Sequence, residues 1–83
     1  MLPAVNKNPF NHQQQKLREL LRQVRIEADV KQADLAKRLG APQSFVSKYE
    51  SGERRLDLIE VRQVCQALGI HLARFVELFE EAL

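Results

Sequence analysis

The chain has 83 residues, of which 45% are hydrophobic and 29% charged, and this composition indicates one small globular domain with a modest core. One cysteine excludes an internal disulfide, and the absence of a run of about 18 apolar residues argues against a membrane span. Residues 1–56 contain 11 Lys and Arg against 6 Asp and Glu, a net +5, whereas residues 57–83 contain 2 against 5, a net −3. This asymmetry suggests a polyanionic partner, although a solvated mixed surface explains it nearly as well.

The first ten residues contain Pro3 and Pro9 without apolar periodicity, and we expect a loose tail. Asn11 with Gln14 three residues later predicts a capping box, and a helix over about residues 12–28. Its apolar stripe is Leu17, Leu20, Leu21 and Val24. Asp29 is expected just past the helix end, where Asp tolerates left-handed backbone.

Glycines at positions 40, 52 and 69 each follow a short apolar stretch, as residues that end helices do. They predict a helix over 32–39, with Leu35, Ala36 and Leu39 inward. The next helix is predicted over 42–51, with Pro42 at its first position and with Val46 and Tyr49 inward.

Two further helices are predicted in the last third of the chain. Asp57 and Glu60 have capping-box spacing before the fourth helix. Its predicted stripe is Leu58, Val61, Val64, Cys65 and Leu68. A fifth helix begins near Leu72 and contains Phe75, Val76, Phe79 and Leu83. Because no segment alternates like a half-buried strand, we predict an all-α, compact five-helix bundle over residues 11–83.

The second and third predicted helices are separated only by Gly40 and Ala41, so they must cross at a steep angle. Ala36 suits the crowded crossing point, and Val46 is placed to fill the space between the two helices. Apolar residues at 35, 39 and 49 complete a specific helix-turn-helix pattern.

From residue 17 to residue 78 the sequence resembles the Cro and phage-repressor proteins, also called the Xre family. The resemblance rests on QADLA at 32–36, on QSFVSKYESG at 43–52, on ERR at 53–55 and on ALGI at 67–70. It implies a lambda-repressor-like DNA-binding domain whose third helix enters the major groove of double-stranded DNA. It also implies a bacterial or phage protein that is cytoplasmic and associated with the nucleoid, in agreement with the lone cysteine and the lack of a signal-peptide core.

Four polar side chains of the third helix are the candidates for reading bases. With Val46 and Tyr49 buried, helical geometry places the others on the opposite side. They are Gln43, Ser44, Ser47 and Lys48. Gln pairs with adenine, Lys reaches guanine and Ser contacts either. Phe45 either touches a thymine methyl or covers the edge of the core, and its apolar character favours packing.

Phosphate contacts are expected on both flanks of this helix. The start of the second helix offers free N–H groups, and in the resembled family the residue at Gln32 holds a phosphate. Lys31 replaces the usual hydroxyl cap, at a cost of about 1 kcal/mol, and its charge is expected to reach a phosphate instead. Pro42 likewise replaces a hydroxyl residue that often touches phosphate in that family. Arg54 and Arg55 are expected to hold the other flank, unless they are ordinary solvated charges.

The resemblance implies two further features. Arg25 and Glu50 match positions that form a buried ion pair, the alternative being two surface charges. The apolar residues Phe75, Val76, Phe79 and Leu83 exceed what so small a core needs, and relatives bind DNA as twofold dimers. We therefore expect a homodimer built mainly by the fifth helix.

No metal-ligand spacing, nucleophile-and-base grouping or glycine-rich phosphate loop is present, so no metal, cofactor or enzymatic activity is expected. The leading hypothesis is a transcriptional regulator that binds a palindromic operator. Its context is that of a phage-type repressor, a restriction–modification controller or an antitoxin-type autoregulator. The alternative is a helical protein-interaction module in which DNA binding is weak or lost.

Overall fold

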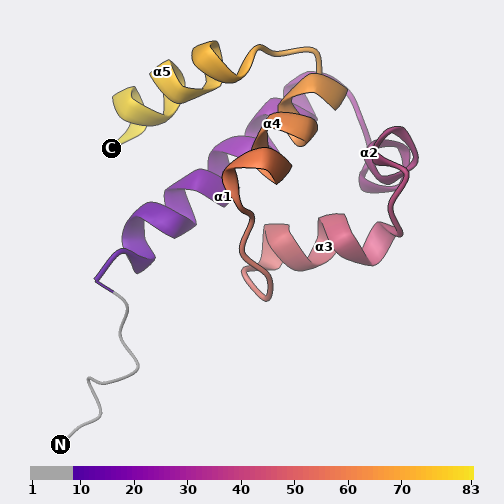
Figure 1. The fold of residues 1–83 in the computed structure, drawn as a ribbon, viewed down its shortest axis with the longest axis horizontal. Helices are drawn as coiled ribbons and strands as arrows, with labels where there is room; N and C mark the ends of the chain where they lie inside the picture. The colour runs from indigo at the N-terminus through magenta and orange to yellow at the C-terminus, as the bar shows by residue number, and fades with distance from the viewer. Residues whose placement is uncertain (1–8) are drawn as a thin grey trace, which may run out of the picture.

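The computed structural model describes residues 9–83 and contains five helices within that range (Figure 1). They are α1 (Asn11–Glu27), α2 (Gln32–Leu39), α3 (Gln43–Ser51), α4 (Leu58–Ala67) and α5 (Leu72–Ala82). No strand occurs among these residues, so the all-α, five-helix prediction is confirmed. The expected tail over residues 1–10 falls almost entirely outside the described range.

The helices pack around one core that each of them helps to build. α3 packs on α2 and α1, α4 packs on α2 and α5, and α5 also packs on α1. Along the vertical direction of Figure 1, α3 and α5 lie at opposite ends of the molecule. One face of α3 therefore packs on the core, and the opposite face lies at the end of the molecule that is farthest from α5.

Most of the predicted helix ends are confirmed. Gly40 and Gly52 end α2 and α3 with left-handed φ values of 66° and 90°, which most residues other than Gly, Asn and Asp adopt only with strain. Asp29 follows α1 with φ 58°. At the start of α4, the Glu60 N–H donates to Asp57 Oδ1 at 2.8 Å, and the Asp57 N–H donates to Glu60 Oε1 at 3.0 Å, which completes the predicted capping box.

Two predicted helix starts are wrong by one residue. Phe10, not Asn11, is the N-cap of α1, and no side chain caps this end. Asn11 is already helical, and the Gln14 N–H donates to the Phe10 carbonyl instead. Similarly, Pro42 is the extended N-cap of α3 rather than its first helical residue. In α1 and α3 the first backbone hydrogen bonds of the helix set its start, and each start lies one residue away from the position that the sequence indicated.

The core is close to the predicted one. It comprises Leu21, Val30, Leu35, Ala36, Val46, Tyr49, Val61, Val64, Cys65, Leu68 and Phe75. Burial raises the pKa of the Cys65 thiol to about 11, which keeps it protonated near neutral pH. Leu58 was predicted to join this core but is 65% exposed, as is Ile59. Periodicity identifies the apolar face of a helix, but it does not show where along that face the neighbouring helices end.

None of the helices in residues 9–83 combines the length and the apolar character that a membrane crossing needs. The same residues contain no cluster of His, Cys, Asp and Glu that could hold a metal ion.

Candidate nucleic-acid interface

α2 and α3 form a helix-turn-helix whose geometry depends on small and apolar residues at the crossing. The Ala41 N–H donates to the Ala36 carbonyl at 3.0 Å, and this bond closes the turn at Gly40. Ala36 and Val46 are both buried where the two helices meet. A tight turn and a filled crossing hold α3 at a fixed angle against α2.

The polar side of α3 faces away from the core. Gln43, Ser44 and Lys48 are exposed, and Ser47 is half-buried, with its hydroxyl donating to the Ser44 carbonyl at 3.3 Å. Within residues 9–83 the side chains of Gln43, Ser44 and Lys48 make no hydrogen bond or ion pair. The structure thus places all four predicted base-reading residues together, with three of the side chains available to a ligand.

A buried ion pair fixes α3 against α1. Arg25 Nε donates to Glu50 Oε2 at 2.7 Å, and Arg25 Nη2 donates to Glu50 Oε1 at 3.0 Å. The two side chains are only 10% and 4% exposed. The hydrogen bond with Glu50 raises the pKa of Arg25, although burial acts against it. This is the pair that the resemblance implied, in the bidentate geometry that makes such contacts strong.

Gln32 joins this ion pair from the first residue of α2. Its Nε2 donates to Glu50 Oε1 at 2.9 Å, and Arg25 Nη1 also donates to the Val30 carbonyl at 2.9 Å. One carboxylate therefore connects α1, α2 and α3. The structure gives Gln32 a role in positioning α3, and only part of its side-chain amide remains for the phosphate contact that the resemblance implied.

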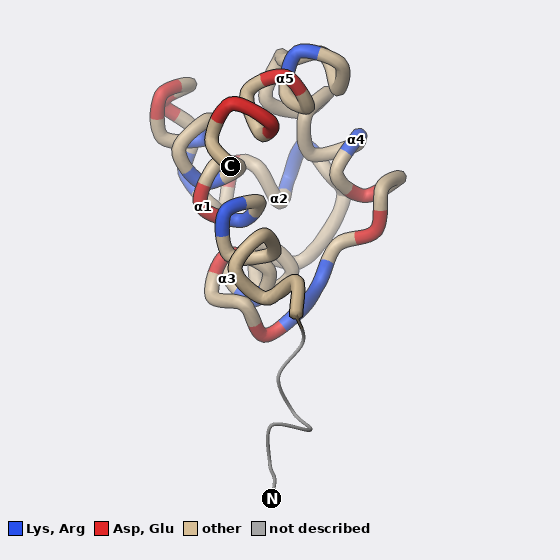
Figure 2. Tube along the Cα trace, turned by 90° about the vertical axis from the view of Figure 1, so that its left-hand side faces the viewer, with Lys and Arg blue, Asp and Glu red and all other residues tan. Residues whose placement is uncertain are grey.

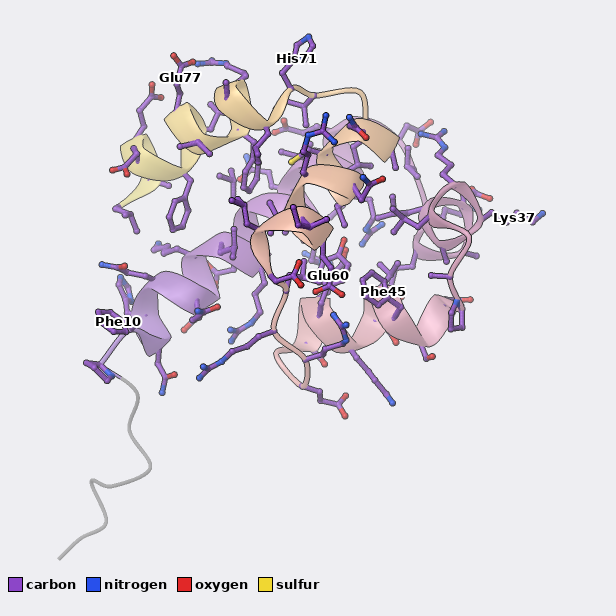
Figure 3. All side chains as sticks on the ribbon, in the orientation of Figure 1. Phe10, Lys37, Phe45, Glu60, His71 and Glu77 are labelled. Carbon is purple, nitrogen blue, oxygen red and sulfur yellow. The ribbon has the colours of Figure 1, made fainter. Side chains whose placement is uncertain are left out.

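Arg54 is exposed at the surface, but contacts within its own chain engage its guanidinium. Its Nη2 and Nη1 donate to the Glu60 carboxylate at 2.6 and 3.2 Å, and its guanidinium lies 4.7 Å from the centre of the Phe45 ring. Figure 3 shows Phe45 and Glu60 pointing into the same space between α3 and α4. Arg54 lowers the pKa of the Glu60 carboxyl through these hydrogen bonds. A phosphate contact by Arg54 would have to displace Glu60.

Phe45 packs at the edge of the core. Its ring meets Tyr49 edge-on, with centroids 5.7 Å apart. Between Tyr49 and Arg54, the ring is half-buried, which is the packing role that its apolar character favoured.

Lys31 and Arg55 are the freest of the four candidates for phosphate contacts. Lys31 is the exposed N-cap of α2, and its side chain makes no capping bond, as predicted. Arg55 is exposed, and its side chain has no ion pair within residues 9–83. In Figure 2 the basic stretch that follows α3 lies between acidic positions, so the positive charge there is local rather than a broad patch.

The four apolar residues predicted to form the dimer interface do not behave alike, and one of them, Leu83, lies just past the end of α5. Phe75 is 1% exposed and belongs to the core of its own chain, and Phe79 packs against that core. Val76 and Leu83 remain 42% and 52% exposed. The apolar surface that α5 leaves for a partner is therefore smaller than expected.

Two features of this region were not foreseen from the sequence. Glu60 was expected only as a cap, because nothing in the spacing of residues 54 and 60 signals their ion pair. The hydroxyl of Tyr49 is buried without a hydrogen-bond partner within residues 9–83. An apolar pattern predicts burial of a tyrosine ring but not the surroundings of its hydroxyl.

The comparisons with known proteins agree with this geometry. The helix-turn-helix family model matches residues 21–75. A solved structure described as an XRE-family like protein from Pseudomonas syringae pv. tomato str. DC3000 is 40% identical, with a TM-score of 0.84 over 95% of this chain and 96% of that one.

More distant structures share the fold. The restriction–modification controller protein C.Esp1396I, solved as a tetramer in complex with its natural 35 base-pair operator, is 20% identical, with a TM-score of 0.79 over 84% of this chain and 92% of that one. The wild-type controller, solved separately, gives the same identity, TM-score and coverage. No protein of curated function matches the sequence.

Proposed function

The chain belongs to the XRE family of helix-turn-helix proteins, which are DNA-binding regulators of transcription, and on this premise we propose that it binds a palindromic operator as a homodimer. In this proposal α3 enters the major groove, and regulation follows from occupancy of the operator without a catalytic step. The observation that carries the proposal is the exposed polar side of α3, held in place by the buried Arg25–Glu50 pair.

The side chains on that side of α3 have the chemistry that base recognition needs. Gln43 can donate to and accept from one adenine edge, and Lys48 can donate to guanine acceptors. Ser44 and Ser47 can do either, and Ser47 is pre-oriented by its bond to the Ser44 carbonyl. These four residues form the proposed reading surface.

Backbone phosphates are held from the flanks of α3. Lys31 stands at the start of α2, where unpaired N–H groups and the helix dipole favour an anion. Arg55 lies beyond the other end of α3 and is unpaired within residues 9–83. We assign both to phosphate contacts, and we assign Arg54 to shaping the segment between α3 and α4 while it is paired with Glu60.

The variants Gln43→Ala and Arg55→Ala should separate recognition of bases from binding of backbone phosphates. Gln43→Ala should weaken specific binding by about 1–3 kcal/mol and relax base preference at one position per half-site. Arg55→Ala should weaken binding to every sequence and lower the salt slope by about 1, because one phosphate contact is lost. Gel-shift titrations over a range of salt concentrations measure both. If the two variants behaved equally on specific and random duplexes, this division of roles would be rejected.

The homodimer is proposed to form through α5. A twofold dimer places its two α3 helices about one helical turn, about 34 Å, apart on the DNA. Val76 and Leu83 supply exposed apolar area, and the half-buried Phe79 lies beside them. The controller protein that shares this fold was solved as a tetramer on its operator, and this supports association of such domains on DNA.

Val76→Glu should convert the dimer to a monomer in sedimentation experiments at micromolar concentration. The charge would be buried without a partner in the interface, whereas in the monomer it is solvated. Leu58→Glu is the matched control, because Leu58 is equally apolar and 65% exposed but lies on α4. A dimer disrupted by Leu58→Glu and not by Val76→Glu would move the interface to the start of α4, and a wild type that stays monomeric even on its DNA would reject the homodimer.

A further inference from the structure

An open groove lies between the first half of α1 and residues 52–56, the segment that leads from α3 to α4. Its volume is about 560 Å³, within the range of about 300–1,000 Å³ that is usual for ligand sites. We call it the arginine groove, because Arg18, Arg54 and Arg55 all line it. None of the reading residues of α3 takes part in it.

The arginine groove has an unbalanced positive charge. None of the described residues that line it is acidic, and His12 is there as well. Arg54 is neutralised by Glu60, which lies outside the groove lining. Arg18 and Arg55 have no ion pair within residues 9–83. Two guanidinium groups therefore share one concave site without a carboxylate to compensate them.

Arg18 is placed in this site by a glycine. A Cβ atom added at Gly52 would lie 3.0 Å from Arg18 Cζ, so the guanidinium fills the space that a side chain would occupy. The left-handed backbone at this position, with φ 90°, also favours glycine. Arg18 of α1 therefore packs against the end of α3, and residues of both helices line the groove.

One buried residue of α3, Tyr49, also lines the groove. Its side chain is 1% exposed, and its hydroxyl has no partner in the described part of the chain. A buried hydroxyl without a partner costs about 1–3 kcal/mol, so such groups are uncommon unless something else binds them. Because burial raises the pKa of Tyr49 far above neutral, the hydroxyl keeps its proton and can donate it.

We propose that the arginine groove is a phosphate-binding site in which Arg18 and Arg55 hold the phosphate from α1 and from the segment after α3. Guanidinium groups match the geometry of phosphate oxygens and form two-point hydrogen bonds with them. The phosphate has two possible sources, the DNA backbone beyond the bases that α3 reads or a free phosphorylated small molecule. Only the DNA source rests on the proposed function.

The test compares Arg18→Gln with Arg62→Gln, which removes the same charge from an exposed position of α4 that does not line the groove. Since Arg18 makes no ion pair within residues 9–83, the variant should keep the helical circular dichroism and melting behaviour of the wild type. Each protein is titrated with random-sequence duplex DNA between about 50 and 200 mM salt. Each is also titrated with inorganic pyrophosphate by calorimetry at low salt.

If the phosphate belongs to DNA, Arg18→Gln should lower the salt slope by about 1 and weaken binding to every duplex about tenfold, with no such change in Arg62→Gln. If the phosphate is free, pyrophosphate should bind wild type and Arg62→Gln but not Arg18→Gln. The inference is overturned if Arg18→Gln matches Arg62→Gln on DNA and wild type binds no pyrophosphate. Pyrophosphate binding without any duplex binding by wild type would keep the groove and reject the proposed function instead.

Discussion

Glu50→Ala is expected to lower the free energy of unfolding by about 3–5 kcal/mol. The substitution leaves the Arg25 guanidinium buried with one remaining hydrogen bond, to the Val30 carbonyl, and removes the acceptor of Gln32 as well. A domain of this size has only about 5–15 kcal/mol of total stability, so the substitution removes a large share of it. Urea unfolding followed by circular dichroism measures the loss.

The double variant Arg25→Met/Glu50→Met separates the cost of burying an unpaired charge from the contribution of the ion pair to the free energy of unfolding. Apolar residues of similar volume often replace a buried ion pair with little loss, so this variant should recover most of the stability. DNA affinity should recover less, because α3 would no longer be tied to α1 and α2 through one carboxylate. If Glu50→Ala cost less than about 1 kcal/mol, the range of an exposed pair, the three-helix connection through Glu50 would be rejected.

Phe75→Ala is expected to cost about 3–5 kcal/mol, because it removes a large side chain that is 1% exposed and leaves a cavity. The loss should not depend on protein concentration, since the ring fills the core of a single chain. Val76→Ala, at the next and largely exposed position, is the matched control and should change monomer stability by no more than about 0.5 kcal/mol. A Phe75→Ala loss that vanished on dilution would return Phe75 to the dimer interface, where it was first expected.

The helices and the crossing of α2 and α3 could be predicted because local rules determine them. The spacing of Ala36, Gly40 and Val46 encodes a turn and a filled crossing, and the structure contains both. The capping box of Asp57 and Glu60 is likewise a local signal that survives in the fold. The polar side of α3 follows from helical geometry, because Val46 and Tyr49 face the core from the opposite side.

What could not be predicted depends on contacts between distant elements. Leu58 has the periodicity of a core residue, yet no neighbouring helix covers it. Arg54 has the charge and position expected of a phosphate contact, yet its guanidinium is paired with Glu60 and lies over the Phe45 ring. The arginine groove joins Arg18 to residues more than thirty positions away, and no sequence spacing signals such a site.

Selection from a pool of random duplex DNA tests the central claim most directly, namely that the exposed polar side of α3 reads sequence. The wild type should enrich a palindrome whose half-sites lie about 10 base pairs apart, and Gln43→Ala should lose preference at one base pair of each half-site. Recovery of no enriched sequence at low salt, or of the same site with the same preferences by Gln43→Ala, would contradict the account.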